Sequence, residues 1–305
     1  MKIKIMATTS FLMWICFQPT YSAPPDIILW DNHDIPNPTH IILKEQSSKT
    51  GSVTGVSLPR LHVYLPTYKN NHAAILVISG GGYAHEEIGH EGTPTSKYLQ
   101  QQGFTVFELI YRLPKEGWTS PLVPFQDGQR AMRLIRSKSK IYDYNSNKIG
   151  VIGFSAGGHL AGILSTTWET QYYPPTDAID TLSSRPDFSA LIYPVISMSP
   201  PLNHTHAYKS LLGIHSTLAD QQTLSVQLLV TPETPPTFIA HAKDDPISPV
   251  ENSILMHQAL DKNHVTNQMI LFPDGGHGWG LGKKGTTAIQ WPALMMQWLK
   301  DIKII

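Results

Sequence analysis

The chain has 305 residues, which is enough for one large α/β domain or two small ones. Its 23 Lys and Arg residues balance its 23 Asp and Glu residues, and no run of like charge stands out. This balance excludes the strongly basic surface of a nucleic-acid or polyanion binder and favours a neutral sugar or another small neutral molecule as partner.

Residues 1–23 predict a signal peptide. Two lysines open the segment, residues 5–17 are mostly apolar, and small residues close it before Pro24. A retained membrane anchor is the alternative, but the apolar stretch is short for a bilayer span. We therefore expect an exported protein, periplasmic or secreted. Its one cysteine, Cys16, lies in this segment, so residues 24–305 must be stable without disulfide bonds.

Strands and helices are predicted to alternate along the rest of the chain. Buried apolar runs predict strands at 61–66, 72–79, 104–111, 148–154, 187–195, 237–242 and 267–273. Helical patterns follow at 94–102, with Thr93 as N-cap, and at 125–139, 156–168, 249–263 and about 288–300. This alternation predicts an α/β fold: a mostly parallel central sheet with helices on both faces.

One polar, proline-bearing segment, residues 196–236, interrupts the alternation. It is short, and the strand pattern resumes after it. We therefore expect residues 24–305 to form a single catalytic domain, with 196–236 as an insertion or lid over the edge of the sheet.

The sequence GFSAGGHLA, residues 153–161, places Ser155 between a predicted strand and a predicted helix. This context is typical of a nucleophile elbow, in which a strained turn exposes a reactive serine. Gly153 and Gly157 are then required because the turn brings the backbone too close for a Cβ atom. The alternative is that these small residues serve only helix and sheet packing.

A nucleophilic serine needs a histidine base and a carboxylate that orients it, in the chain order Ser, acid, His for this fold class. Asp244 and Asp245 follow the predicted strand 237–242, and His277 follows the next strand among glycines. The carboxyl ends of parallel strands meet at one edge of a sheet, so these side chains are expected to gather beside Ser155.

The glycine-rich loop SGGGY, residues 79–83, follows a buried strand, where this architecture places an oxyanion hole. We expect the amides of Gly81, Gly82 and Ala156 to bind the oxyanion. Tyr83 and Glu91, on and near this loop, are expected to contact the substrate.

A further pair, His204 and His206, could bind a metal, but its loop context favours two exposed side chains, and no metal site is predicted. His241 lies on a predicted strand and is expected to be buried and hydrogen-bonded.

Together these segments resemble the α/β-hydrolase family, and within it the bacterial acetyl esterase branch that includes acetylxylan esterases and feruloyl-esterase-like proteins. The resemblance is carried by SGGGY, HEG, IYRLP, QDGQRAMRLIRS, IGVIGFSAGGHLAG, RPDFSALIYPVIS, TPPTFIAHAKDDPISPVENS and GGHGWG. It implies that Ser155 is the nucleophile, His277 the base and Asp245 the acid. Ser79 stands where many relatives have a histidine.

The resemblance implies a serine esterase that hydrolyses short-chain acetyl esters and deacetylates xylan or xylo-oligosaccharides. It implies no metal or organic cofactor, no nucleic-acid partner and no membrane contact after signal cleavage. The alternatives are a general short-chain carboxylesterase or a feruloyl esterase, then a serine peptidase, and, in another class, a binding protein of the same fold without catalysis.

Overall fold

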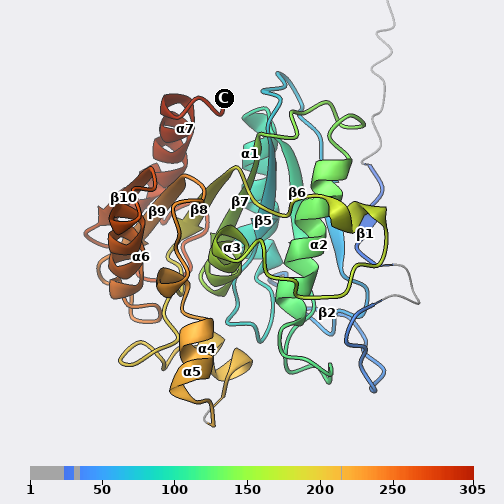
Figure 1. Cartoon of the computed structure of the whole chain (residues 1–305). Helices are drawn as coiled ribbons and strands as arrows, with labels where there is room; N and C mark the ends of the chain where they lie inside the picture. The colour runs from blue at the N-terminus through green and yellow to red at the C-terminus, as the bar shows by residue number, and fades with distance from the viewer. Residues whose placement is uncertain (1–23, 31–34, 214) are drawn as a thin grey trace, which may run out of the picture.

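An eight-stranded sheet runs through the described part of the computed structural model, which comprises residues 24–30, 35–213 and 215–305 (Figure 1). The spatial order of its strands is β1 (Ile27–Ile28), β4 (Arg60–Tyr64), β6 (Thr105–Ile110), β5 (Ala74–Ile78), β7 (Ile149–Phe154), β8 (Phe188–Ile192), β9 (Thr237–Ala242) and β10 (Asn267–Phe272). The predicted signal peptide lies outside the described residues.

Most neighbouring strands of this sheet are parallel. The exceptions are at one edge, where β4 pairs antiparallel with both β1 and β6. A separate short hairpin joins β2 (Gln46–Ser47) and β3 (Val53–Thr54). Every residue of β5, β6, β7, β8 and β9 is buried, as expected for apolar strands covered on both faces.

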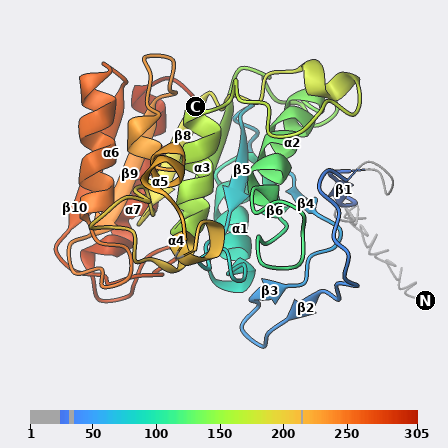
Figure 2. The same cartoon turned by 60° about the horizontal axis from the view of Figure 1, so that its bottom comes forward.

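Helices cover both faces of the sheet. Figures 1 and 2 show α2 (Val123–Ser137), α3 (Ala156–Thr166) and α6 (Glu251–Lys262) side by side on one face. The opposite face carries α1 (Thr93–Gln101) and α7 (Trp291–Asp301). Each face has its own apolar core, one packed by Leu134, Leu160 and Met256, the other by Leu99 and Trp291. The predicted α/β fold with a mostly parallel sheet is confirmed.

The segment 196–236 connects β8 to β9. It contains two short helices, α4 (His206–Leu211) and α5 (Leu218–Thr223). Figure 1 shows both at one end of the sheet, beyond the layers formed by the long helices.

The predicted start of the first long helix is wrong by one residue. Thr93 is the first residue of α1 and Gly92 its N-cap, because a wider helical turn, η1 (Ile88–Gly92), runs directly into the helix. The Thr93 hydroxyl donates to Glu108 Oε1 at 2.9 Å and caps no backbone amide.

Within the described ranges, no helix combines the length and the apolar character needed to span a bilayer.

Candidate active site

Ser155 occupies a strained turn between β7 and α3. Its φ of 50° and ψ of −115° are rare for a residue with a side chain. A Cβ atom at Gly153 would lie 2.1 Å from the carbonyl oxygen of Gly157, so only glycine fits this close approach. The turn has the strained geometry of a nucleophile elbow and presents the Ser155 hydroxyl at the carboxyl end of β7.

Three side chains from three loops form one hydrogen-bonded chain. The Ser155 hydroxyl lies 2.8 Å from Nε2 of His277, and Nδ1 of His277 lies 2.7 Å from Oδ2 of Asp245. Ser155 follows β7, Asp245 follows β9 and His277 follows β10, so all three meet at the carboxyl edge of the sheet. In this arrangement the imidazole can take the serine proton while the carboxylate orients the ring.

Asp245 is held by four hydrogen bonds. Its Oδ1 accepts from the amides of Ile247 at 2.8 Å and Ser248 at 2.9 Å, and its Oδ2 accepts from His277 and from Nε2 of His241 at 3.2 Å. Burial opposes ionisation of this carboxyl, but the hydrogen bonds from the two histidines, the charge of His277 and the amide of Ser248 together lower the pKa of Asp245 to about 2. The carboxylate is therefore charged at any physiological pH.

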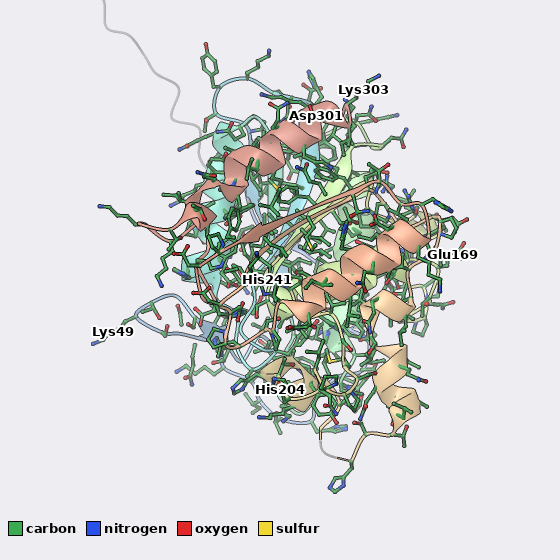
Figure 3. The ribbon with its side chains drawn as sticks, turned by 90° about the vertical axis from the view of Figure 1, so that its left-hand side faces the viewer. Lys49, Glu169, His204, His241, Asp301 and Lys303 are labelled. Carbon is green, nitrogen blue, oxygen red and sulfur yellow. The ribbon has the colours of Figure 1, made fainter. Side chains whose placement is uncertain are left out.

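The neighbouring carboxylate, Asp244, is exposed and accepts no hydrogen bond from His277. It accepts instead from the amide of Gly276 at 2.8 Å, in the loop that carries the histidine. His241 is fully buried and donates to Asp245, and Figure 3 labels it beside one end of α6.

The glycine-rich loop after β5 lies directly beside the serine. A Cβ atom at Gly80 would be 2.9 Å from the Cβ of Ser155. Gly81 and Gly82 adopt φ values of 116° and 65° and line the same pocket as Ser155. In the described part of the chain, no oxygen accepts a hydrogen bond from the amides of Gly81, Gly82 or Ala156. These three amides are therefore available to an oxyanion.

A pocket of about 520 Å³ opens over Ser155 and His277. Small and apolar side chains are mixed in its wall with polar ones: Ala84, His85, Glu87, His90, Glu91, Val195, Thr205, His206, Ala207 and Ile247. A larger groove of about 940 Å³, lined by Tyr64, Thr93 and their neighbours, includes none of the three catalytic candidates. We place the site at the smaller pocket because the reactive groups converge there.

The prediction that Tyr83 contacts the substrate is wrong. Its side chain is fully buried, and its hydroxyl donates to Nδ1 of His159 at 2.9 Å. Tyr83 has a positive φ of 56° and does not line the pocket over Ser155.

Glu91 does line the pocket, but it is only 2% exposed and its carboxylate has two protein partners. Gly80 donates its amide to Oε2 at 2.6 Å, and Tyr193 donates its hydroxyl to Oε1 at 2.9 Å. Burial raises the pKa of Glu91, while these hydrogen bonds and nearby His277 act against that rise. Substrate contact by Glu91 stays a prediction.

Sequence reasoning missed two residues of the site. Tyr193, directly after β8, is fully buried and packs its ring edge-on against His277 with centroids 4.9 Å apart. Its position at the carboxyl end of a strand, shared with the other site residues, was the available signal. His206 was expected to be an exposed side chain, and it is exposed, but it also lines the pocket from α4. His204 is exposed.

Comparisons with known proteins give one family and several relatives. The family model BD-FAE matches residues 61–260. An acetylxylan esterase from Xylanibacter ruminicola is 33% identical over 241 residues, which is 75% of this chain and 45% of that protein. An endo-1,4-beta-xylanase B from Butyrivibrio fibrisolvens is 33% identical over 223 residues, 72% of this chain and 34% of that protein. The chain thus spans less than half the length of these two relatives.

A solved structure of similar size also matches. The acetyl ester-xyloside bifunctional hydrolase from Caldicellulosiruptor lactoaceticus superposes with a TM-score of 0.80 at 33% identity, covering 94% of this chain and 100% of that one. A thermophilic esterase from Thermogutta terrifontis, at 22% identity and a TM-score of 0.69, shares the fold; the match covers 87% of this chain and 96% of that one.

Proposed function

Because the chain belongs to the BD-FAE family of α/β-hydrolases, we propose that it is a serine esterase that removes acetyl groups from xylan or xylo-oligosaccharides. The observation that carries the proposal is the hydrogen-bonded chain from Ser155 through His277 to Asp245, beside the available amides of Gly81 and Gly82. These are the parts that acyl transfer through a serine requires.

The reaction proceeds in two steps. Ser155 Oγ attacks the ester carbonyl while its proton passes to Nε2 of His277, and the resulting oxyanion is bound by the amides of Gly81, Gly82 and Ala156. The imidazolium then protonates the departing sugar oxygen, which leaves an acetyl group on Ser155. Water attacks this acyl-enzyme in the same way and releases acetate and the free serine. Asp245 stays ionised and stabilises the imidazolium of both steps.

The substrate proposal is supported by the pocket wall and by the relatives. His85, Glu87 and His206 offer hydrogen-bonding groups of the kind that sugar hydroxyls need, and the chain has no net charge to attract an ionic substrate. The similar protein from Xylanibacter ruminicola is named for deacetylation of xylan.

The proposal is tested by assaying purified protein on acetylated xylan, on aryl acetate, propionate and butyrate, and on a feruloyl ester, beside Ser155→Ala. We expect acetate release from xylan and a preference for the aryl acetate, both lost in the variant. Equal inactivity of the two proteins on every ester would exclude an esterase. Faster butyrate hydrolysis with no acetate released from xylan would favour a general carboxylesterase, and a feruloyl preference would favour a feruloyl esterase.

We also propose that the protein is exported, by cleavage of residues 1–23. The basic start and short apolar stretch of this segment support the proposal. Expression of the full chain in a bacterial host, followed by fractionation and N-terminal sequencing, is expected to give a periplasmic or secreted protein that begins near Pro24. An uncleaved, membrane-bound product would contradict it.

A further inference from the structure

A chain of three hydrogen bonds links the two loops that carry the catalytic groups. The amide of Gly80, in the oxyanion loop, donates to Oε2 of Glu91 at 2.6 Å. The hydroxyl of Tyr193 donates to Oε1 of the same carboxylate at 2.9 Å. The tyrosine oxygen in turn accepts from the amide of Gly280 at 3.0 Å, in the loop that carries His277. One buried carboxylate thus contacts the oxyanion loop directly and the histidine loop through one side chain.

Both ends of this series of hydrogen bonds lie next to the reacting groups. A Cβ atom at Gly80 would lie 2.9 Å from the Cβ of Ser155 and 3.0 Å from Oε2 of Glu91, so this stretch of loop is clamped between the serine and the carboxylate. At the other end, the ring of Tyr193 packs edge-on against the imidazole of His277. Tyr193 also has a φ of 37°, a strained value that persists only where surrounding contacts impose it.

We propose that Glu91 is a positioning residue. It holds the oxyanion loop, residues 79–83, and the loop after β10 that carries His277 in a fixed position relative to each other. The inference rests on the proposed esterase function and extends it, because it assigns the geometry of the oxyanion hole to a residue outside the triad. Donors fixed in advance at the place where negative charge develops act mainly on the transition state, so Glu91 is expected to affect kcat more than KM.

The chemistry of the side chain makes the proposal specific. A carboxylate can accept from Gly80 and from Tyr193 at the same time, whereas glutamine has one acceptor oxygen and one donor NH₂ group. In Glu91→Gln, the one oxygen can accept from the amide of Gly80 or from the hydroxyl of Tyr193, but not from both at their present positions. If it keeps Gly80, the NH₂ group faces the tyrosine oxygen, so in either orientation one of these two donors loses its acceptor. When Tyr193 is phenylalanine this conflict disappears, and the glutamine oxygen is free to accept from Gly80.

The experiment is a double-mutant cycle with Glu91→Gln, Tyr193→Phe and the double variant on an aryl acetate. We expect Glu91→Gln alone to lower kcat by roughly 10²-fold with little change in KM, the scale for loss of one oxyanion donor. Added to Tyr193→Phe, the same change is expected to cost less than about threefold, because the acceptor is restored. Equal losses in both backgrounds, or wild-type kcat in Glu91→Gln, would overturn the proposal.

Glu108→Gln is the matched control. Glu108 is also buried and accepts from a tyrosine hydroxyl, that of Tyr64 at 2.6 Å, but it contacts none of the catalytic groups. It is expected to lower stability and leave kcat unchanged. A kcat loss equal to that of Glu91→Gln would assign the effect to general damage to the fold.

A second readout separates this inference from the proposed function. The rate at which Ser155 reacts with an aryl phosphonate depends on the oxyanion hole but requires no ester turnover, and it is expected to fall in Glu91→Gln in the same way as kcat. If the wild type hydrolyses no ester, the proposed function fails, while the phosphonate rates of the four proteins still decide the role of Glu91. Unchanged phosphonate rates would refute that role.

Discussion

Asp245 shows how a single side chain can serve two histidines. His277 and His241 both donate to its Oδ2, and two backbone amides donate to its Oδ1. Nδ1 of His241 accepts in turn from the hydroxyl of Ser253 at 2.7 Å. Both carboxylate oxygens are thus used twice, so the side chain has one orientation only. Asp245 is therefore fixed by both histidines and by the backbone of its own loop.

This arrangement predicts a large effect of Asp245→Asn. The one oxygen of the asparagine is expected to stay with the amides of Ile247 and Ser248, which turns the NH₂ group toward His277 and imposes the wrong tautomer on it. We expect kcat to fall by about 10⁴-fold. Asp244→Asn is the matched control, because an asparagine oxygen can still accept from Gly276, and its kcat is expected to stay within about threefold of wild type. Steady-state kinetics on an aryl acetate compares the two, and a larger loss at Asp244 would exclude Asp245 as the acid.

At the scale of elements, the site depends on how α4 packs on the oxyanion loop. A Cβ atom at Gly82 would lie 2.6 Å from the Cβ of His206, the first residue of α4. The segment 196–236 therefore forms part of the pocket wall and contacts the loop whose amides face Ser155.

Gly82→Ala is expected to displace either the loop or α4 and to lower kcat by at least about 10²-fold, the scale for loss of one oxyanion donor. Gly285→Ala provides the control. Gly285 also has a positive φ, of 87°, but a Cβ atom there would have no atom of the described residues within 4 Å, apart from its immediate chain neighbours. That variant is expected to lose about 1–2 kcal/mol of stability from backbone strain and keep its kcat. Kinetics and urea unfolding of both variants test this, and an unaffected kcat in Gly82→Ala would show that the contact has no role in catalysis.

The long elements could be predicted from the sequence because their patterns are local. The run TFIAHA is β9 residue for residue, and KIGVIGF differs from β7 by one residue at its start. The start of α1 could not be predicted, since the wide turn η1 runs directly into the helix and the Thr93 hydroxyl bonds to Glu108 on a distant strand instead of capping it. The two-residue strands β1, β2 and β3 carry no periodic signal at all.

At the scale of the whole molecule, the buried His159 connects three parts of the fold. On α3, its Nδ1 accepts from the hydroxyl of Tyr83 under the oxyanion loop, and its Nε2 donates to the carbonyl of Leu224 in the segment 196–236 at 2.8 Å. Burial lowers the pKa of His159 to about 4, although the bond to Leu224 acts in the opposite direction. The folded protein therefore keeps this histidine neutral where an unfolded chain would protonate it.

The free energy of unfolding is expected to fall as the pH drops through the range in which only the unfolded state is protonated at His159. Above about pH 6.5, His159 is neutral in both the folded and the unfolded protein, and its full contribution to stability is present. Between about pH 6.5 and 4, only the unfolded protein takes up the proton, so stability falls. Urea unfolding at pH 7 and pH 5 is expected to show that the wild type loses about 2 kcal/mol more than His159→Gln over this interval. His40→Gln, at an exposed histidine, is expected to behave like the wild type. Parallel curves for wild type and His159→Gln would contradict the linkage.

The sequence pattern could not predict which charged residues pair across the molecule. Arg130 on α2 is only 5% exposed and pairs with Asp177 at 2.6 Å and Asp180 at 2.9 Å. A fully buried Arg112 pairs likewise with Asp127 at 2.7 Å. Helical periodicity marks a face as polar, but a partner on a distant segment decides whether that face is exposed or buried. The triad residues, in contrast, followed strands that were themselves predictable.

The strand order has a consequence for how the chain reaches this structure. In the parallel part of the sheet each pairing joins segments separated by a helix or more, as in Ile78 opposite Gly153, and the central strand β5 lies between β6 and β7. Such topologies close long loops before they gain contacts, which slows folding. If the protein is exported as we propose, slow folding would leave more time for transport before the sheet forms. The same sheet that aligns the catalytic loops would therefore also slow its own assembly.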